Sequence, residues 1–344
     1  EGEMLDGSNP LFEWQSVAPF EEIPKRFSKR YVQNANEAPW LVNMEAPIED
    51  YSPLYGDTEY QQSPRTQLSL VLLEHLKKQD AKAKFSDLRA AMANKRLYLA
   101  ELVVDDLITR CKTYPEYSLE GNTIDLTSAC QVLENWDRRA NLDSVGSHIF
   151  REYAIQLQMY RYTQGCEEAC WGEKFDVTRP LSTPAKLPEV VDANNDLHLY
   201  ALANAVVAIA EADLTNQAEV SQYQQLVKGN KSHPIAGGMG DFTGSFSTLN
   251  VDTENGGNYL SYSGLNDSGY NISVGDGFVF LLEFTEKGVN ANSVLLYSQS
   301  NNPDSAHYFD QAPLIDGAAY KPVNFSEASI QRDGNLTTET LKIK

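Results

Sequence analysis

Residues 63–76 read SPRTQLSLVLLEHL, and the character of the chain changes here. Serine is a favoured N-cap residue and proline suits the first helical position, so Ser63 and Pro64 mark the start of a helix. Leucine or valine then recurs at positions 68, 71, 72 and 76, which is the spacing of one helix face. A helical block therefore begins here, and the segments on either side of it need a separate interpretation.

The preceding segment, residues 1–62, is rich in proline, asparagine and aromatic side chains and lacks helical periodicity. Such a composition favours short strands joined by ordered loops. We expect a strand at Arg30–Gln33, so the segment is predicted to be β and loop structure.

Helical periodicity defines a block over residues 63–228. Four more helices are expected in it, over 86–111, from Asp125 onward, over 149–160 and over 197–214. Residues 167–191 form a proline-containing connection between the last two. The block is therefore predicted to be mainly helical.

The last segment, residues 229–344, returns to β character. Six glycines between positions 237 and 257 mark turns, and strands are expected at Phe278–Phe284 and Val294–Tyr297. The first of these is apolar enough to be covered on both faces. The predicted fold class is α+β, with the first and last segments sharing a sheet and the helical block inserted between them.

Composition limits the possible partners. The 344 residues are 42% hydrophobic and 22% charged, which suits a folded protein with a core. The net charge of -20 disfavours nucleic acid and anionic membrane surfaces as partners. The longest apolar run, Ala201–Ala210, is broken by Asn204 and is shorter than the roughly 20 residues that span a bilayer.

Common catalytic motifs are missing from the sequence. It contains neither a phosphate-binding loop nor a Gly-x-Ser-x-Gly elbow, and its five histidines lack metal-ligand spacing. The glycines of 237–244 are interpreted as turn residues. Taken alone, these residues describe an acidic α+β protein without a complete catalytic set and without a metal site.

Two stretches near the start change this interpretation. Trp14–Pro24 reads WQSVAPFEEIP, and Tyr31–Trp40 reads YVQNANEAPW. They resemble the penicillin amidase family, and within it the acyl-homoserine-lactone and aculeacin-type acylases. The family pattern is Trp-x-Gly-x-x-Pro-Phe-Glu-Glu-Leu-Pro followed by Tyr-Val-Gln-Asn-x-Asn-x-x-Pro, and Ser16 stands where the family favours glycine.

The resemblance continues through the rest of the chain. Residues 125–143 resemble the family segment that ends Trp-Asp-x-Arg, and 298–300, 306–311 and 320–323 resemble its C-terminal motifs. Ser298 and Asn301 replace two glycines of that last pattern. The match therefore covers nearly the whole chain.

The resemblance implies an N-terminal-nucleophile hydrolase with an αββα sandwich and a large helical insertion. In such enzymes a precursor cuts itself, and the new N-terminal serine attacks an amide with its own amine as base. This chain resembles the C-terminal part of the β-chain. The family nucleophile belongs upstream of Trp14, whereas the sequence starts at Glu1 with no signal peptide. We therefore expect a processed product or a piece that is inactive alone.

The same resemblance implies partners and a compartment. The expected partners are the upstream β-chain segment and the α-chain of the same precursor, together with a small N-acyl substrate. The expected location is periplasmic or secreted.

Site residues follow from the motif positions. Asn36, second in Asn-x-Asn, is expected to donate its side-chain amide to the oxyanion hole. Arg65 is expected to lower the pKa of the N-terminal amine as a fixed cation. Gln33 and Asn34 are expected to hold the loop, and Trp40 either lines the acyl pocket or packs in the core.

No cofactor is expected, with one possible exception. Some family members bind calcium near this loop, which makes Asp50 or Asp57 a candidate ligand.

The function implied is hydrolysis of a linear N-acyl amide to a carboxylate and an amine. Acyl-homoserine lactones are the first candidate substrates and penicillin-type side chains the second. The alternative is a non-catalytic binding or structural module built on an acylase scaffold.

The four cysteines are expected to form two disulfides. Cys111 ends one predicted helix and Cys130 lies in the next, and two consecutive antiparallel helices would bring them together. Cys166 and Cys170 are close enough in sequence to pair in a turn. Both bonds imply an oxidising compartment, and four buried thiols in a cytoplasmic protein are the alternative.

Overall fold

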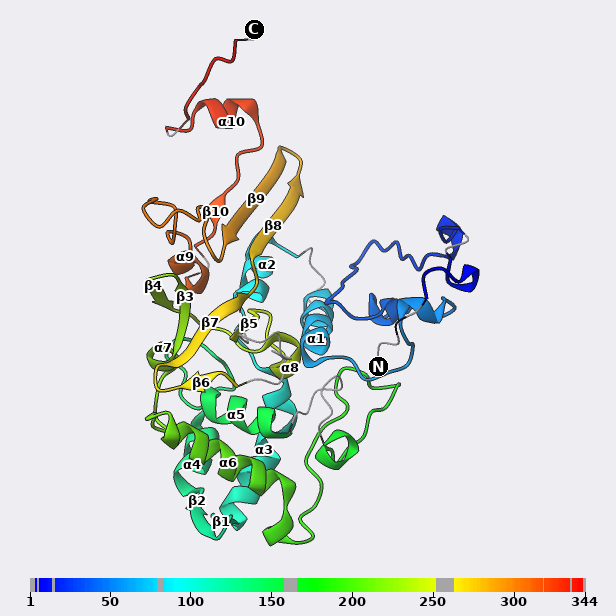
Figure 1. Ribbon diagram of the computed structural model, residues 1–344. Helices are drawn as coiled ribbons and strands as arrows, with labels where there is room; N and C mark the ends of the chain where they lie inside the picture. The colour runs from blue at the N-terminus through cyan, green and yellow to red at the C-terminus, as the bar shows by residue number, and fades with distance from the viewer. Residues whose placement is uncertain are drawn as a thin grey trace. The chain divides into compact units, whose positions relative to one another are not determined.

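The computed structural model describes residues 4, 6–13, 16–78, 83–157, 166–251, 263–317, 319–334 and 336–342 (Figure 1). The chain divides into two compact units, Glu1–Tyr60 and Gln61–Lys344, and each is described by itself. Parts of three sequence-based expectations lie outside the described residues, namely Trp14 and Gln15 of the first motif, residues 158–160 of an expected helix, and the glycines at 256 and 257.

The first unit is built from loops and short 3-10 helices, which lie at Pro10–Phe12, Phe20–Glu22, Pro39–Leu41 and Pro53–Tyr55. Proline opens three of them, because its fixed φ suits the first helical position. In the described part of this unit no strand forms, so the strand predicted at Arg30–Gln33 is wrong. That segment is held instead by the Gln33 N–H, which donates to the Val42 carbonyl at 2.9 Å.

The second unit contains the helices. They are α1 (Pro64–Lys78), α2 (Phe85–Met92), α3 (Tyr98–Thr113), α4 (Thr127–Asn135), α5 (Ser147–Leu157), α6 (Leu197–Glu211), α7 (Val220–Tyr223), α8 (Gly240–Thr243), α9 (Ala312–Asp316) and α10 (Glu327–Gln331). The prediction of a helix from Ser63-Pro64 is confirmed by α1, and α5 packs against α6. Two 3-10 turns, Glu167–Cys170 and Ala193–Asn195, interrupt the connection between α5 and α6.

The helix predicted over 86–111 is two helices, so this prediction is wrong in its continuity. Between α2 and α3, residues 94–97 run alongside residues 138–140: the Leu97 N–H donates to Arg138 O at 3.0 Å, and the Ala140 N–H donates to Lys95 O at 2.9 Å. The Asn94 side chain accepts the Arg96 N–H at 2.7 Å. Tertiary hydrogen bonds therefore replace the helical ones that the periodicity alone predicted.

A hairpin that the sequence did not reveal follows α3. Strands β1 (Glu116–Leu119) and β2 (Asn122–Asp125) pair antiparallel around Glu120 and Gly121, which have φ of 51° and 85°. After it, Asp125 Oδ1 accepts the Thr127 N–H at 2.8 Å, which satisfies one donor in the first turn of α4.

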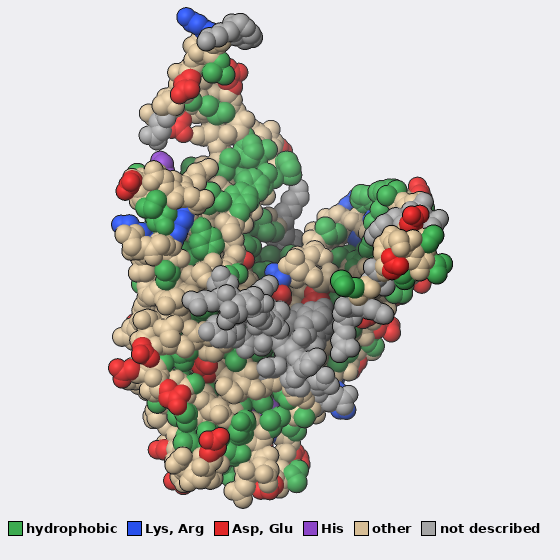
Figure 2. Space-filling model, in the orientation of Figure 1, with side chains coloured by type: hydrophobic (Ala, Val, Ile, Leu, Met, Phe, Trp, Pro, Cys, Tyr) green, Lys and Arg blue, Asp and Glu red, His purple; other side chains and the backbone are tan. Residues whose placement is uncertain are grey.

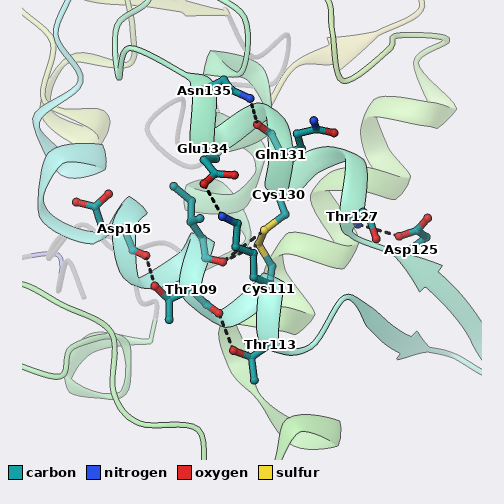
Figure 3. Close-up of a disulfide and its surroundings, with 12 residues drawn as sticks. Asp105, Thr109, Cys111, Thr113, Asp125, Thr127, Cys130, Gln131, Glu134 and Asn135 are labelled. Carbon is teal, nitrogen blue, oxygen red and sulfur yellow. Dashed lines mark hydrogen bonds and ion pairs between the residues drawn. A yellow bond between two sulfur atoms is a disulfide. The ribbon is translucent and has the colours of Figure 1, made fainter.

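A disulfide then joins α3 to α4 (Figure 3). It links Cys111 to Cys130, the pairing expected from the sequence, with their Cα atoms 6.0 Å apart. An ion pair between Lys112 and Glu134 connects the same two helices. The structure also pairs Cys166 with Cys170.

The strands after residue 223 form two sheets. The first orders β4-β3-β7-β5, with β6 also on β7, and only the β3–β7 pair is parallel. Its strands are β3 (Gln224–Lys228), β4 (Lys231–Pro234), β5 (Leu249–Val251), β6 (Leu265–Asn266) and β7 (Gly269–Gly275). The second orders β10-β9-β8 and is antiparallel, with β8 (Phe278–Thr285), β9 (Gly288–Leu295) and β10 (Lys321–Pro322).

The strand predicted at Phe278–Phe284 is confirmed, but its predicted burial on both faces is wrong. Phe278, Phe280 and Phe284 are exposed, whereas Leu281 is buried. Only one face of β8 therefore packs on the core.

One hydrophobic core joins the helical and β-rich parts of the second unit. Its buried side chains run from Leu97 in the helical block to Tyr320 near the C-terminus. Among its largest members are Phe150, Tyr153 and Tyr270. The helical and β-rich segments predicted on either side of residue 228 therefore fold together. Among the described residues, no helix is long and apolar enough to cross a membrane.

Alanine substitutions at two glycines distinguish the free-energy cost of a strained backbone from that of a steric clash. Gly244 (φ 80°) and Gly121 (φ 85°) share a left-handed conformation. A Cβ on Gly244 would lie 2.8 Å from the Tyr98 Cβ and 2.9 Å from the Pro64 Cβ, whereas a Cβ on Gly121 meets nothing within 4 Å. We expect Gly121→Ala to cost about 1 kcal/mol and Gly244→Ala about 1–3 kcal/mol more in free energy of unfolding, measured by urea denaturation. Equal costs for the two variants would contradict the close packing at Gly244.

Candidate functional site

The loop around Asn36 is shaped by the side chain of Asn34. Asn34 Oδ1 accepts the Asn36 N–H at 2.8 Å, and Asn34 Nδ2 donates to the Glu37 carbonyl at 3.2 Å. Between these bonds Asn36 has φ of 68°, a left-handed conformation that asparagine tolerates better than most residues. Asn36 itself is exposed. The Asn-x-Asn pattern thus combines a loop-forming residue with an exposed amide.

Gln33 closes the base of this loop. Its backbone N–H donates to Val42 O, and its side-chain amide donates to Leu41 O, both at 2.9 Å. These two bonds hold the ends of the loop together.

Trp40 anchors the far side of the loop. Its side chain is 3% exposed, and its ring centroid lies 6.0 Å from that of Tyr60. Two roles are expected for Trp40, lining the acyl pocket or packing in the core. Its burial within this unit fits core packing.

Tyr60 and Glu37 are site residues that the sequence motifs did not indicate. The Tyr60 hydroxyl donates to Glu37 Oε2 at 2.8 Å and accepts the Ala38 N–H at 2.9 Å. Glu37 is 9% exposed, so its carboxylate is largely removed from water beside the hydroxyl. Gly56 packs so closely that a Cβ there would lie 2.7 Å from the Ala38 Cβ. These contacts support the residues that follow Asn36.

Arg65 lies in the second unit, in the first turn of α1. Its Nε donates to Asp241 Oδ1 at 2.5 Å, and the two side chains are 18% and 24% exposed. Asp241 is in the first turn of α8, so the ion pair ties α1 to α8. The structure thus places Arg65 in a partly buried ion pair with Asp241.

The two candidate calcium ligands lie at exposed loop positions of the first unit. Asp50 and Asp57 are both exposed, and the Asp57 carbonyl accepts a hydrogen bond from Tyr51 at 2.9 Å. In the part of the chain that the structure describes, no three His, Cys, Asp or Glu side chains group as metal ligands. Calcium binding stays a prediction.

A buried polar cluster, also not indicated by the sequence, fixes the segment between α2 and α3. Lys95 Nζ donates to Ser247 Oγ at 2.7 Å and lies 4.0 Å from Asp316 Oδ1. Burial lowers the pKa of Lys95 and raises the pKa values of Asp276 and Asp316, while the opposite charges partly offset both effects. The cluster joins the helical block to β-rich segments far away in sequence, which indicates a structural role.

The buried histidines are structural in the same way. His148 Nε2 lies 3.0 Å from Thr215 O, and His198 Nδ1 lies 2.8 Å from the Tyr153 hydroxyl. Burial lowers the pKa of each imidazole to about 4. Both rings are therefore neutral at pH 7 and belong to the core.

The C-terminal motif also has a structural explanation. Ser298, which stands where the family pattern has glycine, has φ of 58°. Its hydroxyl accepts the Gln311 N–H at 2.9 Å, and the buried Gln311 side chain accepts the Leu295 N–H at 3.0 Å. The left-handed backbone explains why glycine suits this position.

The sequence profile of the penicillin amidase family, described as "Penicillin amidase", matches residues 2–332. The chain belongs to the penicillin amidase family.

Two curated relatives are similar to nearly the whole chain. Aculeacin-A acylase of Actinoplanes utahensis is 30% identical over 327 residues, covering 91% of this chain and 37% of that protein. Acyl-homoserine lactone acylase PvdQ of Pseudomonas syringae pv. syringae (strain B728a) is 26% identical over 343 residues, covering 96% of this chain and 40% of that protein. The chain thus spans less than half the length of these relatives.

One solved structure is similar over most of the chain. It is a thermostable penicillin G acylase from Alcaligenes faecalis in orthorhombic form, with a TM-score of 0.43 and 15% identity. The similarity covers 96% of this chain and 61% of that one.

The hydroxyl of Tyr60 provides a test of the loop. We expect Tyr60→Phe to lower the free energy of unfolding by about 1–3 kcal/mol, because the buried Glu37 carboxylate and the Ala38 N–H both lose a partner. The Ala38 amide should then exchange with solvent at least about tenfold faster. Tyr51→Phe is the comparison variant, since its hydroxyl donates to the carbonyl of exposed Asp57 and interacts with the Trp40 backbone rather than with Glu37 or Ala38. Unchanged exchange at Ala38 in Tyr60→Phe would contradict the assigned support.

Proposed function

We propose that this chain is the part of an N-acyl amide hydrolase that carries the oxyanion-hole asparagine, Asn36. The observation that carries the proposal is the Asn34-built loop, which presents an exposed asparagine in a left-handed conformation within a family motif. The reaction is hydrolysis of a linear amide to a carboxylate and an amine.

The proposed role of Asn36 follows from the charge that develops in amide hydrolysis. Attack on the carbonyl carbon places a negative charge on the carbonyl oxygen, and a fixed amide N–H stabilises that charge. The donor is most effective when it does not have to reorganise during the reaction. The bonds made by Asn34, Gln33 and Tyr60 support the proposal because they fix the backbone on both sides of Asn36.

The nucleophile is proposed to come from the rest of the enzyme, an N-terminal serine whose own amine serves as base. Its hydroxyl oxygen bonds to the carbonyl carbon while the hydroxyl proton passes to the serine's own α-amine. The α-amine returns that proton to the leaving nitrogen as the carbon–nitrogen bond breaks, and water then hydrolyses the acyl ester. We also propose that the complete protein has the αββα sandwich, with the upstream β-chain segment and the α-chain as partners. Coverage of 37% and 40% of two relatives supports a larger functional unit.

The proposed electrostatic role of Arg65 needs to take its partner into account. A cation lowers the pKa of a nearby amine, but Asp241 at 2.5 Å offsets much of that charge. We propose that Arg65 acts mainly by joining α1 to α8 and only secondarily through its field.

Substrate and compartment are proposed from the relatives and the cysteines. The relatives' names, an aculeacin-A acylase and acyl-homoserine lactone acylases, support an amide with an acyl chain as substrate. Acyl-homoserine lactones are the first candidates and penicillin-type side chains the second. The two cysteine pairs support a periplasmic or secreted enzyme, because disulfides persist in oxidising compartments.

The 344-residue chain alone is expected to hydrolyse no amide, because the proposed nucleophile is supplied by another segment. The measurement is product release from a panel of N-acyl homoserine lactones and a chromogenic phenylacetyl amide. Turnover that follows the chain through purification and is abolished by heating would contradict this expectation.

In the complete enzyme, Asn36→Ala is expected to lower kcat by about 10²–10³, the usual effect of removing one oxyanion donor. Because alanine disfavours a positive φ, Asn36→Gly is the matched variant that keeps the backbone conformation and removes only the amide. Both variants should lose kcat with little change in KM. A near-normal kcat for Asn36→Gly would show that Asn36 only shapes the loop, whereas a complete protein that hydrolyses no amide would favour the non-catalytic alternative.

A further inference from the structure

The outer face of the β8–β9 hairpin carries a row of exposed aromatic side chains. Phe278 is 60% exposed, Phe280 43% and Phe284 84%, and the first two rings stack with centroids 5.8 Å apart. Val289, which pairs with Phe284, is 37% exposed on the same face. We call these four residues the phenylalanine strip, and Figure 2 shows hydrophobic side chains gathered over this hairpin.

The two faces of the hairpin differ because side chains alternate along a strand. Val279, Leu281 and Val294 point to the inner face and pack on the core, and α2 also packs against β8. The outer face of β8 and β9 carries only uncharged side chains, namely Phe278, Phe280, Leu282, Phe284, Val289, Ala291, Ser293 and Leu295. Lys321 of β10, opposite Ser293, adds a charge at its margin.

An uncharged face of this kind is unusual on so acidic a chain. The protein has 22% charged residues and a net charge of -20, yet the four cross-strand pairs on this face of β8 and β9 carry no charge. Exposed edge strands are usually protected by charge, proline or a covering element. In β8 the exposed face has phenylalanine at three of its four positions, which fits a surface that another segment covers.

The backbone of β8 points to the same conclusion. The sheet order β10-β9-β8 leaves β8 at the edge, so along one side its N–H and C=O groups have no partner strand among the described residues. An edge strand of eight residues can accept a further strand by main-chain hydrogen bonding, with side-chain pockets setting specificity.

We propose that an extended, apolar segment from the remainder of an acylase-length polypeptide adds to the β8 edge and covers the phenylalanine strip. The proposal rests on the proposed function only in taking the complete protein to be acylase-sized. Coverage of 37% of aculeacin-A acylase and 40% of an acyl-homoserine lactone acylase leaves more than half of each relative available to supply it. A second copy of this chain is the competing occupant.

Hydrogen–deuterium exchange of residues 278–285 tests the proposal in two proteins, the 344-residue chain and the product of the complete open reading frame. We expect these amides to exchange at least about tenfold more slowly in the complete protein. Equal exchange in the two would overturn the proposal, as would a reading frame that encodes no further segment. Slow exchange in the chain alone, rising on dilution together with a fall in mass from dimer to monomer, would assign the surface to a second copy.

A triple variant tests whether the side chains of the phenylalanine strip, and not only the strand structure of the hairpin, are needed for the docking. Phe278→Thr, Phe280→Thr and Phe284→Thr are combined, because threonine keeps strand propensity while removing the aromatic surface. In the chain alone the unfolding midpoint should fall only slightly, since most of this aromatic surface is exposed and the main loss is the stacking of Phe278 on Phe280. In the complete protein the triple variant should lose the exchange protection of 278–285. Asn290→Thr, on the opposite face of β9, is the matched control and should retain it; loss in both variants or in neither would overturn the proposal.

A parallel measurement distinguishes failure of the docking proposal from failure of the proposed function. Amide hydrolysis by the complete protein is measured in parallel. Hydrolysis with an exposed β8 overturns only the docking surface, whereas a protected β8 without hydrolysis overturns only the proposed activity.

Discussion

The structure of the second unit depends on a junction where three distant segments exchange backbone hydrogen bonds. Residues 95–97 pair with 138–140, the Gly237 N–H donates to Ala140 O at 3.0 Å, and the Tyr98 N–H donates to Gly244 O at 3.2 Å. These bonds stop the helical periodicity before α3 and connect the helical block to the β-rich segment. Because buried backbone groups must be paired, separating the segments would leave several donors and acceptors unsatisfied.

The junction also explains the charges buried beside it. Lys95 leaves water to bond with Ser247 and to approach Asp316, and such a cation is tolerated only where polar partners meet it. Removing one partner of a buried pair generally costs more than the pair contributes. Loss of Lys95 or of Asp316 alone would therefore destabilise the arrangement of the two segments.

The loop of Asn36 and the β8–β9 hairpin differ in how far their own contacts stabilise them. The loop satisfies its own backbone through Asn34, Gln33 and Tyr60, so its geometry is set locally. In the hairpin only the inner face packs on the core, since Leu281 is buried while Phe284 is exposed. The free edge of β8 has no partner strand among the described residues. The first feature suits a preorganised donor group, and the second suits a surface that becomes buried in a larger protein.

The sequence by itself determined the family, the α+β class, the start of α1 and the Cys111–Cys130 pairing, because long motifs, capping residues and helical spacing are local signals. Only the tertiary structure decided the break before Tyr98, the β1–β2 hairpin, the absence of a strand among the described residues of 1–60 and the exposed face of β8. Each depends on partners far away in sequence: Leu97 leaves the helix to bond Arg138, and phenylalanine in a strand looks the same whether or not a neighbour covers it. The contacts of Tyr60 with the loop of Asn36 could not be predicted for the same reason. The Tyr60 hydroxyl lies 22 residues away from Ala38 in sequence, and such a contact has no signature in the local sequence.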